Sequence, residues 1–401
     1  MNKAKNEKVK TWPIISKREK TALISVLKSA DLSKERTLLF ERLGNEWKNY
    51  IGVDYAIPCS SGTAALFLVL AGIDIKPGDE VIIPAFTWWA TAAAIIQHQA
   101  IPIFVDIEEN SFCLDPKKVQ KAITLRTKAI IAVHLHGYPA DMRSLSEIAL
   151  EHDLFLLEDA AQAQGSMYFG KKTGSLGDGA AFSLEMSKLL TSGSVGGIMV
   201  TNSKVIHDNA MAVCGFERGL GWGLRGDVFG QAFAVSQFKK FETRLIQRQK
   251  NCEYLSKKIE KIPGVKIQSL TKDIEHNYYN FVVELVAKDL NVPSSDLPSV
   301  RKKIVQKLNS SGLPAGLWEE KSLPRYSMFK DDNSYLHKFI IGKHNRRKIV
   351  YDASKYPVAD KFSNNHFYIN GVNPPNGFAI MRRYADTLAN ILLEIRGINR
   401  K

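Results

Sequence analysis

The feature that most constrains the fold is a series of short, almost continuously apolar segments that alternate with helical stretches between residues 55 and 201. We predict strands at 55–59, 81–84, 101–105, 129–133, 155–158, 180–183 and 197–201. We predict helices between them at 64–71, 91–97, 116–122 and 142–152. Strands that are apolar on both faces and separated by helices indicate a buried, mostly parallel sheet flanked by helices.

The pattern changes after about residue 251. Segments 265–270 and 279–286 resemble strands, segments 299–310 and 383–396 resemble helices, and 327–351 is polar, basic and loop-rich. This pattern is typical of a smaller α+β domain. We therefore expect an N-terminal arm and a large domain in residues 1–250, and a small C-terminal domain in 251–401.

Parallel sheets bind ligands beyond the carboxyl ends of their strands, and most of the notable motifs follow strands. One of them is residues 59–64 (CSSGTA), where Gly62 and Thr63 open a helix. Glycine allows close approach of the backbone, and the free N–H groups of the first helical turn attract an anion. The alternative is that Ser61 or Thr63 is simply an N-cap.

Asp159 and Lys188 form the most informative pair. Asp159 ends an apolar strand, where a carboxylate is desolvated and needs a cationic or hydrogen-bonding partner. Lys188 lies just past the next predicted strand, 180–183. Gln162 follows Asp159 by three residues, and Ser183 precedes Lys188 by five. An Asp that holds a pyridine nitrogen protonated and a Lys that forms an imine are what pyridoxal phosphate (PLP) requires of a protein. The alternatives are a solvated lysine and an Asp that caps a neighbouring loop.

Two further motifs carry aromatic and imidazole groups. We expect Trp88 to stack on a flat ligand ring and Trp89 to lie in the core. His134 and His136 are spaced like metal ligands on a strand, but no third ligand accompanies them at a convincing spacing, so we predict no metal site.

The net charge of +14 and the pI of about 9.4 suit anionic partners, but the basic residues are dispersed. The densest basic runs are 3–10, 239–240 and 344–348, which we interpret as solvated faces, and we predict no binding to nucleic acid. The N-terminal segment lacks the apolar stretch of a signal peptide, and 64–73 is too short to span a bilayer. Four scattered cysteines suggest reduced thiols and a cytoplasmic protein.

Together these motifs resemble the DegT/DnrJ/EryC1/StrS family of PLP-dependent sugar and aminocyclitol aminotransferases. The resemblance is carried by 60–66 (SSGTAAL), 77–84 (PGDEVIIP), 104–107 (FVDI), 134–142 (HLHGYPADM), 158–163 (EDAAQA), 174–178 (GSLGD) and 188–193 (KLLTSG). It covers roughly residues 35–205, and weaker likeness extends to Trp12-Pro13 and to 355–360. The branch that it resembles most is that of the scyllo-inosose aminotransferases.

The resemblance implies the α/β architecture of PLP fold type I, which is similar to aspartate aminotransferase. It also implies a role for each matching residue: Lys188 bonds to PLP, Asp159 pairs with the pyridine nitrogen, and Gln162 contacts the ring oxygen. Trp88 would stack on the ring, while Gly62, Thr63 and Ser183 would hold the phosphate.

The chain departs from the family pattern in three places. The run 193–197 (GSVGG) is one residue longer than the usual Gly-Glu-Gly-Gly and lacks its acid. Segment 223–230 either replaces the family's Asn-x-Arg segment without the Asn, or that segment is deleted before Gln231. Gln164 stands where the family usually has a histidine.

The function implied is transfer of an amino group from glutamate or glutamine to a keto-sugar or keto-cyclitol, in a homodimer with shared active sites. A PLP-dependent sugar dehydratase is one alternative, although such relatives replace the lysine with histidine. Another is a non-catalytic or regulatory protein of the same fold, suggested by the altered 193–197 turn and the missing Asn. Nucleic-acid binding is the third alternative.

Overall fold

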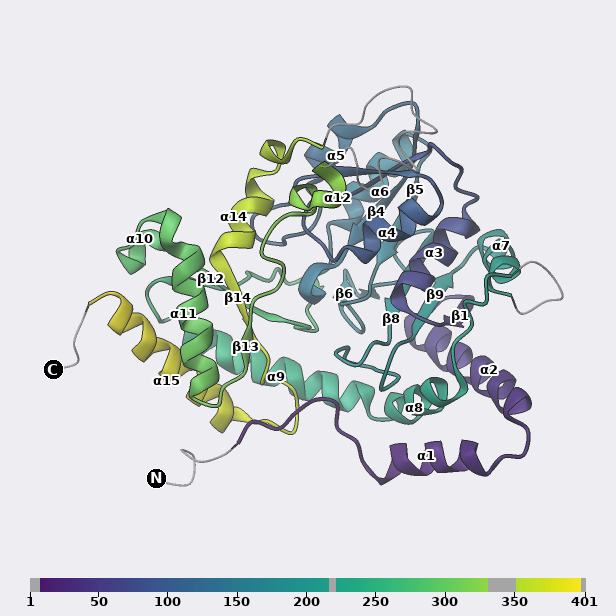
Figure 1. Ribbon diagram of the computed structural model, residues 1–401, viewed down its shortest axis with the longest axis horizontal. Helices are drawn as coiled ribbons and strands as arrows, with labels where there is room; N and C mark the ends of the chain where they lie inside the picture. Colours follow the sequence, from purple (N-terminus) through teal and green to yellow (C-terminus); the bar gives the residue numbers. More distant parts are fainter. Residues whose placement is uncertain (1–7, 216–220, 331–350, 398–401) are drawn as a thin grey trace.

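The computed structural model describes residues 8–215, 221–330 and 351–397 (Figure 1). Its largest sheet has seven strands within these ranges, in the order β1-β9-β8-β5-β4-β2-β3. The strands are β1 (Tyr55–Cys59), β2 (Glu80–Pro84), β3 (Ile101–Val105), β4 (Thr127–Val133), β5 (Phe155–Asp159), β8 (Gly179–Ser183) and β9 (Gly197–Thr201). Neighbouring strands from β3 to β8 pair in parallel, and β9 pairs antiparallel with both β8 and β1. The predicted strands and the mostly parallel sheet are confirmed.

The helices between these strands also lie where the apolar pattern predicts them. They are α3 (Gly62–Gly72), α4 (Ala90–Gln97), α5 (Pro116–Ala122) and α6 (Met142–Glu151). Helix α3 is apolar around almost its whole circumference because it packs on β8 and β9 and also contacts α4 and α7 (Lys204–Cys214). A helix that is hydrophobic all round is a buried one.

Several helices were not predicted from the sequence. They include α1 (Lys17–Lys28), α2 (Leu32–Ile51), α8 (Val228–Phe238) and α9 (Phe241–Ile259), as well as α7. Helix α1 begins with a capping box in which Ser16 and Glu19 bond each other's backbone or side chain. It lies against α8 at the lower edge of the molecule in Figure 1. Helices α1, α2 and α9 carry many charges, which weakened the apolar pattern on which the predictions depended.

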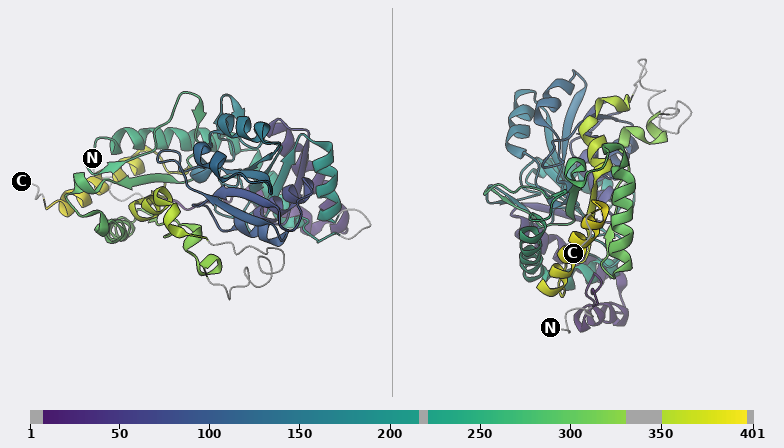
Figure 2. Two further views of the ribbon diagram at one scale, coloured as in Figure 1. Left: turned by 90° about the horizontal axis from the view of Figure 1, so that it is seen from above. Right: turned by 90° about the vertical axis from the view of Figure 1, so that its left-hand side faces the viewer.

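The C-terminal part builds a second sheet in the order β10-β12-β14-β13, beside the first (Figure 2). Its strands are β10 (Val265–Lys266), β12 (Phe281–Leu285), β13 (Ala315–Gly316) and β14 (His366–Ile369), with helices α11 (Leu297–Ser310) and α15 (Phe378–Ile395). These elements share a core of their own with residues of α9. Predicted strand 265–270 is much shorter than expected, and predicted helix 383–396 begins earlier, at Phe378. The domain boundary at 250/251 stays a prediction.

The remaining short elements are β6 (Met167–Tyr168), β7 (Lys171–Lys172), β11 (Ile274–Glu275), α10 (Ala287–Leu290), α12 (Ser327–Lys330) and α14 (Pro357–Asn365). Helix α12 opens the segment predicted to be loop-rich, and residues 331–350 of that segment lie outside the described ranges. The four cysteines of the chain are free and buried.

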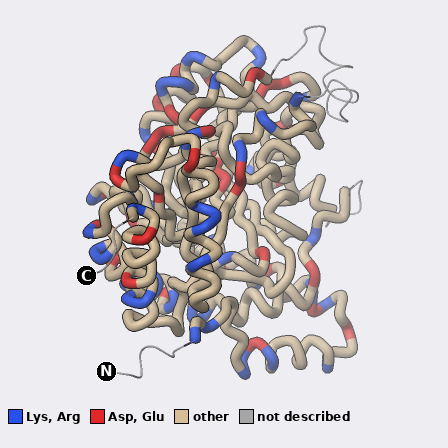
Figure 3. Tube along the Cα trace, turned by 60° about the vertical axis from the view of Figure 1, so that its left-hand side comes forward, with Lys and Arg blue, Asp and Glu red and all other residues tan. Residues whose placement is uncertain are grey.

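Lys and Arg residues are interspersed with Asp and Glu residues along the Cα trace (Figure 3). The basic runs 344–348 and most of 3–10 lie outside the described residues, while Lys239 and Lys240 are described. Within the described part of the chain, no helix combines the length and apolarity needed to cross a membrane.

Candidate active site

A cavity of about 460 Å³ lies at the carboxyl ends of the central strands. Every residue that the sequence marked as a site residue lines it: Gly62, Thr63, Trp88, Asp159, Gln162, Ser183 and Lys188. They come from the start of α3, the loop before α4, the ends of β5 and β8, and the loops after these two strands. The sheet brings them together because the carboxyl ends of its parallel strands share one edge.

Lys188 is half-buried, and its amine has a protein partner. Its Nζ lies 3.1 Å from the hydroxyl of Tyr279 and 4.4 Å from the centre of the Tyr279 ring. Its backbone carbonyl accepts a hydrogen bond of 2.9 Å from Nε1 of Trp12, so the N-terminal segment also contacts this loop. Sequence reasoning missed Tyr279, because it lies 91 residues further along the chain, just before β12.

Asp159 is buried, and its hydrogen bonds come from neutral groups. Oδ2 accepts a bond of 2.7 Å from the Thr91 hydroxyl, and Oδ1 accepts one of 3.2 Å from the Ala161 N–H. Burial raises the pKa of this carboxyl above its ordinary value, although both bonds and the charge of Lys188 oppose the shift. No salt bridge to Asp159 occurs within the described residues. A cation placed in the cavity would therefore find a desolvated carboxylate.

The N-terminus of α3 forms another part of the cavity lining. Ser61 is the N-cap of this helix and accepts a bond of 3.0 Å from the Ala64 N–H, which confirms the capping alternative for Ser61. Gly62 and Thr63 nevertheless line the cavity beside it. A Cβ atom on Gly62 would lie 2.8 Å from Cβ of Ser183, so only glycine allows these two loops to approach so closely.

The two tryptophans differ from their predictions in one respect. Trp88 lines the cavity with 46% of its surface exposed, whereas Trp89 does not line it and is 49% exposed. The expectation that Trp89 lies in the core is wrong, because Trp89 immediately precedes α4 at the surface and its ring lies beside that of Trp88. A third indole, that of Trp318, also lines the cavity and was not predicted.

The side chain of Gln162 is oriented by a backbone N–H group. Its Oε1 accepts a bond of 2.6 Å from the His136 N–H. That bond occupies the acceptor end of the side chain, and Nε2 makes no hydrogen bond to any described residue. The amide N–H₂ group is therefore the end that remains for a ligand.

The two histidines of the 134–142 motif have structural partners. Nδ1 of His134 accepts a bond of 3.0 Å from the Ala140 N–H, so the proton resides on Nε2, which lies 2.9 Å from Glu158. The ring of His136 contacts Asn280 over 2.8 Å. Across the described ranges, no group of three or more His, Cys, Asp or Glu side chains could hold a metal ion.

Gln164, which stands where the family usually has a histidine, stabilises the loop that carries Lys188. Its Nε2 donates to the carbonyls of Ser183 (2.7 Å) and Leu190 (3.0 Å), and its Oε1 accepts from the Leu190 N–H over 2.6 Å. The altered 193–197 turn also reaches the site, because Val195 and Gly196 line the cavity. In segment 223–230, the carbonyl of Leu224 accepts from the Ser60 N–H over 2.7 Å, beside β1 of the same chain.

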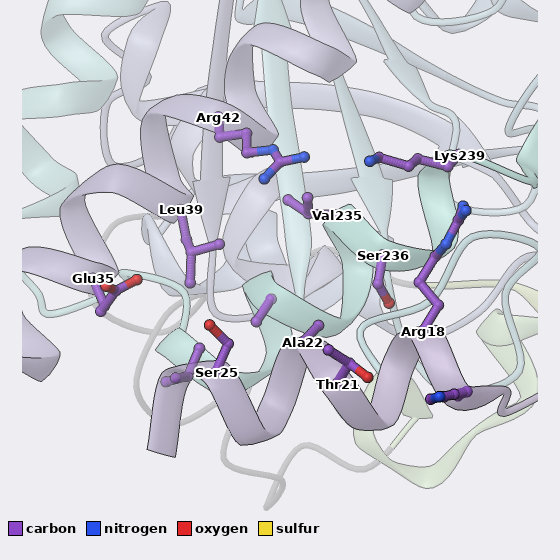
Figure 4. Close-up of a pocket in the computed structure, with 13 residues that line it drawn as sticks. Arg18, Thr21, Ala22, Ser25, Glu35, Leu39, Arg42, Val235, Ser236 and Lys239 are labelled. Atoms are coloured by element: carbon purple, nitrogen blue, oxygen red, sulfur yellow. The ribbon is translucent and has the colours of Figure 1, made fainter. Parts of the chain in front are cut away.

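Another cavity, of about 560 Å³, lies between α1, α2 and α8 and shares no residue with the Lys188 cavity (Figure 4). The side chains of Arg18, Arg42 and Lys239 lie around it, and those of Leu39 and Val235 also line it. It holds none of the predicted site residues and no Asp–Lys pair like that of the first cavity. We therefore place the candidate active site at Lys188.

The fold is that of the fold type I aminotransferases, α/β enzymes with a large sheet and a smaller second one. DesV of S. venezuelae, solved in complex with a ketimine intermediate, superposes with a TM-score of 0.79 at 26% identity, over 93% of this chain and 94% of DesV. The model of the DegT/DnrJ/EryC1/StrS aminotransferase family matches residues 13–364, and the chain belongs to this family.

Two curated relatives act in cyclitol chemistry according to their names. A protein of Streptoalloteichus tenebrarius, provisionally named an L-glutamine:3-amino-2,3-dideoxy-scyllo-inosose aminotransferase, is 39% identical over 53% of this chain. The match spans about half of that relative, 54% of its length. The L-glutamine:2-deoxy-scyllo-inosose aminotransferase of Streptomyces kanamyceticus is 32% identical, with 68% of each chain covered.

Proposed function

We propose that this protein binds PLP at Lys188 and transfers an amino group from glutamine or glutamate to the ketone of a keto-sugar or keto-cyclitol. The observation that carries the proposal is the shared cavity of Lys188 and the buried Asp159 carboxylate. Family membership and the names of the two inosose aminotransferases support the reaction and the class of substrate.

The residues present fit PLP. Asp159 is a desolvated carboxylate that receives no hydrogen bond from a cationic group of the described residues, and a protonated pyridine nitrogen would supply one. The N-terminus of α3 with Gly62 and Thr63, together with the Ser183 hydroxyl, would hold the phosphate. Trp88 would stack on the ring, and Nε2 of Gln162 would donate to the ring oxygen.

PLP, when bound, accepts the electrons of the carbanion that forms beside the transferred nitrogen. Asp159 would keep the pyridine nitrogen protonated, and a proton there strengthens this electron acceptance. Lys188 would carry the proton on its Nζ between the substrate carbon and the cofactor, as general base and then general acid. Trp318 and Val195 would restrict the access of water from the sides of the cavity that they line.

The test begins with the visible absorbance that PLP acquires when it bonds to a lysine. We expect the wild-type protein with PLP to show this band, Lys188→Ala to lack it, and Lys204→Ala, an exposed lysine of α7, to keep it. Glutamine or glutamate should bleach the band, and the correct inosose or keto-sugar should restore it. Absence of the band from wild-type protein, or its persistence in Lys188→Ala, would contradict the proposal.

We further infer a homodimer that shares its active sites and works in the cytoplasm on small molecules. The resemblance to fold type I enzymes and the scattered reduced cysteines support these two inferences. Light scattering tests the first, because a dimer should weigh about twice the 44.9 kDa of one chain.

A further inference from the structure

Among the described residues, the amine of Lys188 has one hydrogen-bond partner, the hydroxyl of Tyr279. The hydroxyl lies 3.1 Å from Nζ, and the ring centre lies 4.4 Å from the same atom. The hydroxyl also lies 2.9 Å from Oγ of Ser187, the residue before the lysine. Tyr279 therefore contacts Nζ of Lys188, the atom that reacts in the proposed function, through both its hydroxyl and its ring.

The phenol can serve both protonation states of the lysine. A lysine ammonium donates to the phenol oxygen, and Tyr279 then donates its own proton to Ser187 Oγ. A neutral amine accepts from the same phenol, while the Ser187 hydroxyl keeps donating to the Glu185 carboxylate over 2.5 Å. The ring face adds attraction for the charged form alone. A lysine side chain without a hydrogen-bond partner populates many rotamers. A lysine that transfers protons therefore benefits from a partner that keeps its amine in one position.

The position of Tyr279 is fixed from behind by two buried polar residues. Asn277 accepts from the Tyr279 N–H over 2.8 Å, and its own Nδ2 donates to the carbonyls of Gln162 (2.9 Å) and Gln164 (3.0 Å). Arg248 is buried and donates to the carbonyl of Tyr279 over 2.7 Å. These bonds tie the loop of the second sheet to the loops that carry the cavity residues.

We propose that Tyr279 is a catalytic residue that holds the Lys188 amine in the cavity, in both protonation states, whenever Lys188 is not bonded to a cofactor. This inference rests on the proposed function, in which Lys188 must be released and then return as a proton carrier. Tyr279 would thereby keep the released amine of Lys188 in one position relative to the substrate carbon. A fixed orientation of this kind raises the rate of proton transfer.

Tyr279→Phe tests the proposal because it removes the hydroxyl and keeps the ring. In the cofactor-free protein, we expect pulsed acetylation of Lys188, quantified by peptide mass spectrometry, to become about fivefold faster, since the amine loses its hydrogen bond. Tyr278→Phe is the matched control: it is the same change one residue away, on a side chain that does not line the cavity, and it should acetylate like wild type.

With PLP bound, Tyr279→Phe should take up the cofactor with an affinity within about twofold of wild type. The single-turnover bleaching by the amino donor should slow by about 100-fold, which is typical of a lost acid–base partner. Ser187→Ala should slow it less, because the phenol retains its contact with Lys188.

Unchanged acetylation in Tyr279→Phe would overturn the proposal, and so would loss of cofactor uptake together with a lower unfolding temperature, which would show a structural role. If the wild-type protein is not bleached by any donor, the proposed function fails. The acetylation comparison would still decide whether Tyr279 holds Lys188.

Discussion

The hydroxyl of Thr91 donates a 2.7 Å hydrogen bond to Oδ2 of Asp159, and this bond joins the first turn of α4 to the end of β5. Both residues are buried, so the bond is shielded from water. It fixes the direction in which the carboxylate faces the cavity. The charged form of Asp159 therefore depends on a residue of a helix, α4, that lies 68 positions earlier in the chain.

Thr91→Val should weaken PLP binding, because it keeps the shape of the side chain but removes the hydrogen bond that orients Asp159. We expect the dissociation constant for PLP to rise about tenfold, corresponding to one hydrogen bond to a charged group. Absorbance titration of the cofactor-free protein measures it. Thr37→Val, the same change on the exposed face of α2, should leave the constant unchanged.

Asp159→Asn should stabilise the cofactor-free protein near neutral pH. Burial raises the pKa of Asp159 in the folded protein above its ordinary value of 3.8. At a pH between 3.8 and this raised pKa, the folded chain keeps a proton that the unfolded chain has lost. The free energy of unfolding therefore falls as the pH rises through this window. The asparagine variant escapes this loss and should be more stable by about 1 kcal/mol at neutral pH.

Urea unfolding at about pH 7.5 and about pH 4.5 checks this prediction, since the advantage of the variant should shrink at the lower pH, where Asp159 is more protonated in both states. A wild-type protein that is the more stable of the two near neutral pH would contradict it.

Gly62→Ala should lower the free energy of unfolding by about 2 kcal/mol, because the new Cβ has no room beside Ser183. The double variant with Ser183→Gly should recover part of this loss, since the crowded Cβ is then absent. Gly377→Ala is a control, because a Cβ there meets nothing within 4 Å. Chemical unfolding of wild type, Gly62→Ala, Ser183→Gly, the double variant and Gly377→Ala measures the effect, and an additive double variant would show that the two residues do not collide.

Gln164→Ala should loosen the Lys188 loop by leaving the buried N–H and carbonyl of Leu190 and the carbonyl of Ser183 without partners. We expect a loss of about 3 kcal/mol in the free energy of unfolding. Gln164→Glu keeps an acceptor for the Leu190 N–H and should lose less. Gln306→Ala, on an exposed position of α11, should be close to wild type in the same urea titration.

The strands and helices around the candidate site were predictable because each is short and apolar. The apolar pattern of each element is contained within a few consecutive residues. Asp159, Lys188 and the Gly62-Thr63 turn follow such strands, so their convergence on one edge required only the parallel topology. Trp89 was predicted wrongly because composition alone cannot tell an indole in the core from one that precedes a helix at the surface.

The sequence by itself determined the large sheet, the family and the residues at its strand ends, because these depend on local patterns and on motifs with fixed spacing. Only the tertiary structure decided the partners of these residues. Thr91 and Tyr279 reach Asp159 and Lys188 from distant parts of the chain, and Gln164 closes the lysine loop with backbone bonds. Hydrogen bonds of this kind depend on the positions of atoms in the folded chain, and no local period of the sequence encodes them.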